Sequence, residues 1–206
     1  MPRNDFSASI QVVSETITAK AKLRSEMRAF LKTSSEDIIN TASAKICRHI
    51  ASSQDLLHGV KTIALFAANG AEISLSGLHD LLPGMQLCYP LCLPHCQLSF
   101  HLVSRTEQLT PGMSGIPEPD PIKHEAISLA DIDLILCPGL AFGMDGSRLG
   151  QGGGYYDRAL EHFTGTACGV IMATQIAPTI PHDNHDVQMH YLASETGILA
   201  TRSPRE

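Results

Sequence analysis

The chain has 206 residues, 43% of them apolar, and a formal charge of −6. Length and apolar content suit one sizeable core, so we expect a single domain over residues 1–206, with 1–13 and 201–206 as flexible tails. The acidic balance excludes a general nucleic-acid binder, which needs a basic surface. No run approaches the roughly 18 apolar residues of a membrane span, which predicts a protein without a membrane partner. Six cysteines without a secretion signal or a framework spacing predict reduced thiols in the cytoplasm.

A helix is predicted near the N-terminus, beginning at Ser14 and running to about Lys32. Lys20 and Arg24 lie one turn apart on this helix, so their charged ends can converge on one ligand. The apolar residues that recur at helical spacing and predict its buried face are Leu23, Met27, Phe30 and Leu31.

A second helix is predicted from Ser34 or Ser35 to about Ala51, with Ile38, Ile39, Ala42, Ile46 and Ile50 facing inward. Beyond Thr62, short apolar runs alternate with turn residues, which is typical of buried strands separated by crossover helices. Strands are expected at 62–67, 85–90, 98–103, 132–138 and 167–172, helices at 75–82 and 153–163, and a last strand within 190–199. Residues 110–123 are expected to form a loop. This order predicts a layered α/β fold with a mostly parallel sheet.

A glycine-rich segment follows the predicted strand 132–138, and residues 137–158 read CPGLAFGMDGSRLGQGGGYYDR. Its glycines 150 and 152–154 lack Cβ atoms, so the backbone N–H groups can approach a polyphosphate. The helix that follows points its positive end at the same place. Arg148 adds a cation suited to phosphate oxygens. These features predict a phosphate-binding loop.

The glycine-rich segment matches neither common phosphate-binding motif. It lacks a Gly-Lys-Ser/Thr ending, and Tyr155 and Tyr156 stand where a dinucleotide-binding loop needs its third glycine or its helix turn. For the glycines alone, a flexible turn without a ligand is an equal alternative. Arg148, the paired tyrosines and Asp157 together favour the binding site.

The same segment resembles the signature of the 5-formyltetrahydrofolate cyclo-ligase family, which runs approximately PGLAFD, two variable residues, GxRLGxGxGYYDR. The matching residues here are Pro138, Gly139, Leu140, Ala141, Phe142, Gly146, Arg148, Leu149, Gly150, Gly152, Gly154, Tyr155, Tyr156, Asp157 and Arg158. The resemblance covers nearly the whole chain. Its further matches are a Lys-x-x-Leu-Arg at Lys20, Leu23 and Arg24, a glutamate after the first strand at Glu72, a Glu-Pro at Glu118 and Pro119, and a His-Asp at His185 and Asp186.

The resemblance implies a three-layer α/β/α fold with a mostly parallel sheet, similar to the sugar-phosphate isomerase and CoA-transferase group. It implies ATP- and Mg²⁺-dependent closure of 5-formyltetrahydrofolate, with or without a polyglutamate tail, to 5,10-methenyltetrahydrofolate by a monomer. The implied ATP-binding residues are Lys20, Arg24, Arg148, Leu149, Gly150, Gln151, Gly152, Gly153, Gly154, Tyr155 and Tyr156. Folate is implied to bind at Glu72, Gln151, Gly152, Gly153, Gly154 and Tyr155, catalysis to involve Arg148 and Glu72, and the metal to bind at Asp157, Asp186 and His190.

The chain departs from the family pattern at three positions. Gly143 replaces an aspartate, for which Asp145 is a candidate substitute, and Leu75 replaces a threonine expected on the folate side. His190 stands where a second aspartate is expected near the metal. These departures leave two alternatives open. One is a catalytically impaired nucleotide- or folate-binding paralogue, and the other is a sugar-phosphate isomerase-like enzyme on the same fold, which needs no ATP.

Overall fold

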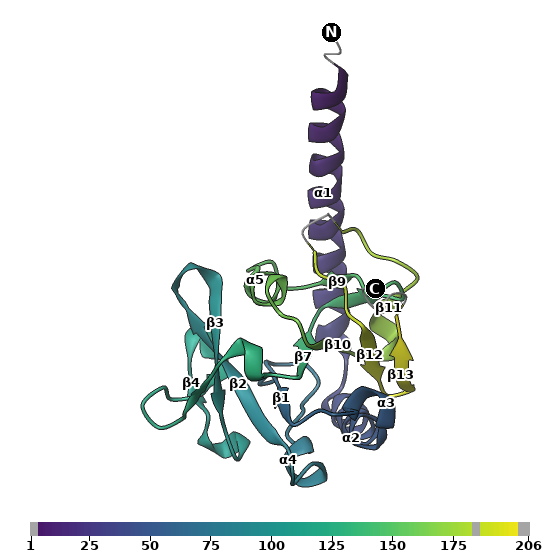
Figure 1. Ribbon diagram of the computed structural model, residues 1–206. Coiled ribbons are helices and arrows are strands. Elements are labelled where there is room, and N and C mark those ends of the chain that lie inside the picture. The colour runs from purple at the N-terminus through teal and green to yellow at the C-terminus, as the bar shows by residue number, and fades with distance from the viewer. Residues whose placement is uncertain (1–3, 183–185, 202–206) are drawn as a thin grey trace.

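The computed structural model describes residues 4–182 and 186–201, with side chains described from Thr16 onward except that of Ser114. A central sheet of eight strands organises the fold (Figure 1). In spatial order these are β13 (Gly197–Ala200), β12 (Tyr191–Ser194), β10 (Thr166–Val170), β7 (Leu134–Pro138), β1 (Thr62–Ala64), β2 (Gln86–Leu93), β3 (Gln97–Leu102) and β6 (Ala126–Ile127). The five strands from β12 to β2 run parallel, whereas β13, β3 and β6 pair antiparallel. The predicted mostly parallel sheet is therefore confirmed.

Helices cover both faces of the sheet and make three layers. They are α1 (Asn4–Thr33), α2 (Glu36–Ser52), α3 (Gln54–Leu57), α4 (Leu78–Leu81) and α5 (Tyr155–Glu161). Successive side chains of a strand point to opposite faces, and β7 shows the result. Leu134 and Leu136 join the core beneath α2, α3 and α4, whereas Ile135 and Cys137 join a second core that includes Leu160 of α5. Because both faces are buried, the central strands are continuously apolar.

The two N-terminal helices are longer or less buried than predicted. The helix α1 begins at Asn4, well before the expected start at Ser14, and Figure 1 shows that its N-terminal half projects from the body. Phe30 and Ile38 are 37% and 58% exposed, so their inward assignment was wrong. Neighbouring helical residues point about 100° apart. Phe30 and Ile38 therefore cannot lie on the same helix face as the residues that follow them, the half-buried Leu31 and the buried Ile39. The cap of α2 is confirmed, since the Ser35 hydroxyl accepts the N–H of Ile38.

Several smaller elements differ from the predicted ones. The strand expected at 62–67 ends at Ala64, and the helix expected at 75–82 contains only the four residues of α4. Two strands, β12 and β13, replace the single strand expected within 190–199. The expected loop at 110–123 holds a short hairpin of β4 (Thr110–Pro111) and β5 (Pro117–Glu118). None of the described helices has both the length and the apolar character that crossing a bilayer requires.

The glycine-rich segment is organised by a small second sheet. Its strands are β8 (Ala141–Gly143), β9 (Arg148–Leu149) and β11 (Ile176–Ala177), in the order β11-β8-β9. Leu140, Ala141 and Leu149 pack there against Leu23 and Met27 of α1. This contact brings the α1 cations beside the glycines.

Candidate active site

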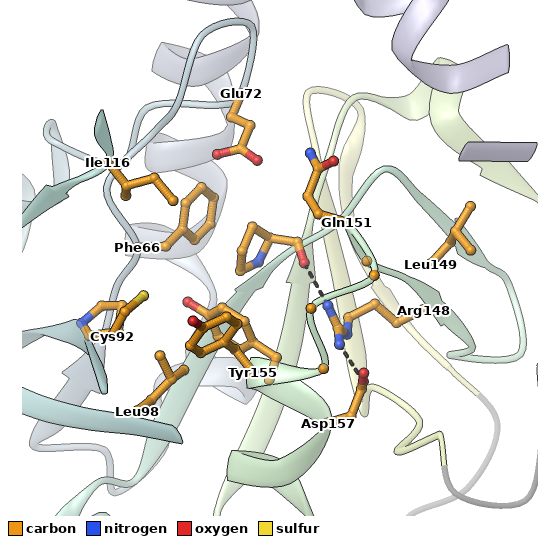
Figure 2. A pocket seen from close by; sticks show the side chains of 18 of the residues that line it. Phe66, Glu72, Cys92, Leu98, Ile116, Arg148, Leu149, Gln151, Tyr155 and Asp157 are labelled. Carbon is orange, nitrogen blue, oxygen red and sulfur yellow. Dashed lines mark hydrogen bonds and ion pairs between the residues drawn. The ribbon is translucent and has the colours of Figure 1, made fainter. Parts of the chain in front are cut away.

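A cavity of about 400 Å³ lies beyond the carboxyl ends of β1 and β7, where parallel α/β sheets commonly bind ligands. Most of the predicted site residues line it, namely Lys20, Arg24, Glu72, residues 148–157 and Asp186. Figure 2 shows Arg148, Leu149, Gln151 and Asp157 on one side of the cavity and Phe66, Cys92, Leu98 and Ile116 on the other. We call the second group the apolar wall. The cavity therefore has a charged side and an apolar side.

The glycine loop, residues 150–154, depends on backbone conformations that glycine adopts freely. Gly152 and Gly154 have φ values of +102° and +73°, in the left-handed region that disfavours residues with a Cβ. Gly154 also precedes the first turn of α5. Arg24 ties α1 to the loop, because its Nε donates to the carbonyl oxygen of Gly150 at 3.0 Å. The loop thus exposes backbone to the cavity and has a cation beside it.

Arg148 is the most buried cation of the cavity, with a side-chain exposure of 5%. Its guanidinium pairs with the Asp157 carboxylate (Figure 2). It also donates to the Pro138 carbonyl at 3.3 Å and lies over the Tyr156 ring. Its Nε and the Tyr156 hydroxyl are buried with no hydrogen-bond partner among the described residues. Burial also raises the pKa of Tyr156 well above its usual value, so the hydroxyl stays neutral. Unsatisfied buried donors are costly and mark a place for ligand acceptors.

A second ion pair in the cavity lining joins α1 to the C-terminal segment. Lys20 Nζ is 2.6 Å from Asp186 Oδ2, and the two side chains are 10% and 16% exposed. Each of these two predicted metal carboxylates thus contacts a predicted phosphate-binding cation, Asp157 with Arg148 and Asp186 with Lys20. The charges within each pair neutralise one another in the free protein.

His190, the third predicted metal ligand, lies apart from the other two. The residue does not line the cavity, and its Nδ1 accepts the backbone N–H of Ala167 in β10 at 3.0 Å. Its ring is therefore used to hold the end of β12 against β10. His185 lies outside the described residues. In the part of the chain that the structure describes, no three His, Cys, Asp or Glu side chains gather as a metal-binding group.

The other two departures from the family pattern also lie away from the cavity lining. Leu75 is 1% exposed within the core beneath α2, so no hydroxyl is lost from the cavity there. Asp145 accepts hydrogen bonds from the Ser147 N–H and the Thr179 hydroxyl, at 3.1 and 3.0 Å. It closes the turn between β8 and β9, and a Cβ at Gly143 would collide with it. Asp145 is therefore a turn residue and not a substitute ligand.

Glu72 lies between the charged side and the apolar wall. Its Oε2 accepts the N–H of Asn69 at 3.0 Å, and the Gln151 carboxamide faces it (Figure 2). Burial raises the pKa of Glu72 above its usual value, although hydrogen bonds from Asn69 and Gln151 oppose the shift. A carboxyl group with a raised pKa suits proton transfer near neutral pH.

Sequence reasoning missed two sets of site residues. Arg28 donates to the Gln151 carbonyl and to its Oε1, both at 3.0 Å, and so fixes that side chain. Its position one helical turn after Arg24 was the signal that could have found it. The apolar wall had no such signal, and Glu118, which also lines the cavity, was matched only to the family's Glu-Pro pattern and was given no role. Those residues come from the segment after β1, from β2 and β3, and from the β4–β5 hairpin, and only folding brings them to the glycine loop.

Glu72→Gln is expected to stabilise the protein at neutral pH. Because burial raises the Glu72 pKa, the folded state binds a proton that the unfolded state releases, so the free energy of unfolding falls as pH rises from 4.5 through the raised pKa. Glutamine cannot ionise and avoids this loss. We expect a melting temperature higher by on the order of 2 °C at pH 7.5 and equal to that of the wild type at pH 4.

Glu125→Gln is the matched control, since it removes an exposed carboxylate outside the cavity. Melting curves of the three proteins between pH 4 and 8 measure the effect. A Glu72→Gln variant that melts at or below the wild-type temperature at pH 7.5 would show that Glu72 is not destabilised by its site.

The fold and the site together define a class: a three-layer α/β protein with a glycine loop and adjacent cations at the carboxyl edge of its parallel sheet. Comparison with known proteins narrows this class. A family model described as the 5-formyltetrahydrofolate cyclo-ligase family matches residues 16–195. The chain belongs to the 5-formyltetrahydrofolate cyclo-ligase family.

Individual relatives agree with this assignment. A 5-formyltetrahydrofolate cyclo-ligase of Mycolicibacterium smegmatis is 41% identical over 91 residues, which cover 43% of this chain and 47% of that protein. One of Escherichia coli is 27% identical over 138 residues, covering 62% and 74%. The NMR structure of Aquifex aeolicus 5,10-methenyltetrahydrofolate synthetase superimposes with a TM-score of 0.78 at 29% identity, covering 91% of this chain and 95% of that one. The match to the Mycolicibacterium smegmatis protein thus spans about half the length of that protein.

Proposed function

We propose that the protein is an ATP- and Mg²⁺-dependent enzyme that closes 5-formyltetrahydrofolate to 5,10-methenyltetrahydrofolate, with release of ADP and phosphate. The observation that supports this most strongly is the buried Arg148, whose unpartnered Nε lies beside the glycine loop in a cavity with an apolar wall. A phosphate group needs a buried cation with an N–H donor beside a glycine loop, and a folate ring needs an apolar wall. The family assignment joins the two in one reaction.

The chemistry explains why ATP is needed. An N5-formyl carbonyl is a poor electrophile because the nitrogen donates electrons into it, and ring closure by N10 would have to expel oxide or hydroxide. Transfer of the γ-phosphoryl group to the formyl oxygen activates the carbon and releases ADP. N10 then attacks that carbon and loses its proton, and the C–O bond breaks with its electron pair leaving on phosphate. Atoms and charge balance without a protein nucleophile.

The residues of the charged side match the demands of phosphoryl transfer, which are positioning and charge neutralisation. Lys20, Arg24 and Arg148 would neutralise the phosphate oxygens, and the glycine loop would offer backbone N–H groups. Asp157 and Asp186 are oxygen ligands of the kind that Mg²⁺ prefers, and the metal would supply charge stabilisation on the phosphates. Because two carboxylates are few, we infer that the metal enters together with ATP.

Glu72 is suited to the proton that ring closure releases. Its raised pKa makes the carboxylate a competent base near neutral pH, and it faces the space between the two sides of the cavity. The apolar wall would bind the face of the pterin ring. Glu72 would therefore orient the folate or accept the N10 proton.

A catalytically impaired paralogue is the second candidate, and the placement of the departures argues against it. Leu75 and Gly143 do not line the cavity, and His190 holds strands together. We also infer that the protein works in a reducing compartment such as the cytoplasm, because all six cysteines are free.

A turnover assay tests the proposed function. With 5-formyltetrahydrofolate, ATP and Mg²⁺, we expect one ADP and one phosphate for each methenyl product, and no product when ATP is omitted. Product at an unchanged rate without nucleotide would contradict the cyclo-ligase assignment. Binding of ATP and folate without turnover would instead indicate a paralogue that has lost activity. Isomerisation of a sugar phosphate without ATP would indicate a sugar-phosphate isomerase-like enzyme.

A further inference from the structure

The β4–β5 hairpin places a buried carboxylate among the residues that line the cavity. Glu118 is 5% exposed. Its Oε1 accepts the N–H of Cys92 at 3.4 Å, and its Oε2 accepts the N–H of Met113 at 3.3 Å. These contacts hold the carboxylate beside Cys92 of the apolar wall. They come from β2 and from the turn of the hairpin, so the position depends on two separate backbone segments.

Glu118 differs from the two cavity aspartates, Asp157 and Asp186, in forming no ion pair among the described residues. Asp157 and Asp186 pair with Arg148 and Lys20, but Glu118 forms no ion pair with any Lys, Arg or His that the structure describes. A buried carboxylate is unfavourable unless hydrogen-bond donors surround it. Two long backbone hydrogen bonds leave most of its lone pairs available. A ligand with N–H groups would complete this environment.

The surroundings of Glu118 specify what kind of donor fits. Pro90, Leu98 and Ile116 line the cavity nearby and favour a flat apolar ring over a hydrated ammonium group. Burial and then the Glu118 carboxylate raise the pKa of Cys92 to about 12, so that thiol stays neutral beside it. The site therefore offers one carboxylate within an apolar slot.

We propose that Glu118 recognises the edge of the pterin ring that bears the 2-amino group and N3–H, and so determines substrate specificity. The inference rests on the proposed function, from which the folate is taken. The pyrimidine ring of a reduced folate presents two adjacent parallel N–H donors, and a carboxylate accepts such a pair with both oxygens. Glu72 is then left for the N5 and N10 end of the substrate.

A purely structural role for Glu118 is the alternative, because its two hydrogen bonds join the hairpin to β2. The two roles differ in what they predict for ligands. A structural tie affects folding and every ligand alike, whereas recognition affects folate alone and depends on the 2-amino group.

The test compares 5-formyltetrahydrofolate with its 2-desamino analogue in steady-state turnover and in calorimetric binding. For the wild type we expect the analogue to lose about 10- to 100-fold in kcat/KM and in affinity. Glu118→Gln should raise the KM for the natural folate by a similar factor, leave the KM for ATP unchanged and abolish the discrimination between the two substrates. Glu125→Gln, which removes an exposed charge outside the cavity, should behave as the wild type.

Equal use of both substrates by the wild type would overturn the inference, and this result needs no variant to fold. An unchanged folate KM in Glu118→Gln, or a parallel rise in both KM values with a lower melting temperature, would overturn it as well. Failure of the proposed function gives a different result, namely a wild type that binds the natural folate but does not turn it over with ATP. In that case calorimetry still measures the difference in affinity between the natural folate and its 2-desamino analogue.

Discussion

Arg148→Ala is expected to lower kcat/KM for ATP by roughly 10²- to 10³-fold, with a fall in kcat as well as a rise in KM. The guanidinium is buried beside the glycine loop, and we infer that it contacts phosphate oxygens whose charge shifts during transfer. Alanine removes that charge and also the partner of Asp157. Initial rates at varied ATP and at varied folate measure the effect.

Arg148→Lys is the matched control for charge. Lysine keeps a cation but cannot reach the Pro138 carbonyl, Asp157 and a phosphate oxygen from one planar group, so we expect it to recover only a small part of the activity. The melting temperature of both variants separates loss of function from loss of fold. A change in folate KM alone, with normal ATP kinetics, would place Arg148 at the folate and contradict its assignment to the phosphates.

Asp157→Asn is expected to abolish activity at any practical Mg²⁺ concentration. We infer that Asp157 binds the metal that enters with ATP, and an amide oxygen is a much weaker ligand for a hard divalent ion than a carboxylate. Asp186→Asn should instead raise the Mg²⁺ concentration for half-maximal activity by about tenfold. We infer that Asp186, which pairs with Lys20, assists Asp157 in binding the metal. Mg²⁺ titrations of kcat measure both.

Two further variants control the metal experiment. Asp145→Asn removes a carboxylate of the neighbouring turn that does not line the cavity, and it should leave the Mg²⁺ requirement unchanged. His190→Asp should also leave it unchanged, because the His190 ring bonds to the backbone of β10. A lower Mg²⁺ requirement in His190→Asp would restore the metal role that the family pattern suggested. Full activity of Asp157→Asn would exclude Asp157 from the metal site.

Much of the candidate site could be predicted because its chemistry is local in sequence. The glycines 150–154, Arg148 and Asp157 lie within one short segment, so their spacing alone indicated a phosphate-binding loop. The same holds for Lys20 and Arg24, which one helical turn places side by side. Short apolar runs between turn residues likewise predicted the central strands, because a strand buried on both faces is apolar at successive positions.

The pairing of charges could not be predicted in this way. Lys20 and Asp186 are separated by 166 positions, and no spacing rule connects them. The backbone partner of His190 could not be predicted either, because its place in the family pattern suggested a metal ligand and gave no sign of the hydrogen bond to Ala167. Both outcomes depend on how β12 and α1 pack against the rest of the chain.

The sequence by itself determined the parallel α/β sheet, the glycine loop and the cations beside it, since these follow from periodicity and short-range spacing. Only the tertiary structure decided that the β4–β5 hairpin brings Glu118 to the cavity, and that Leu75 and Asp145 stay out of it. The physical reason is that a side chain's surroundings are set by contacts between distant segments. Those contacts form when both faces of the sheet are buried together.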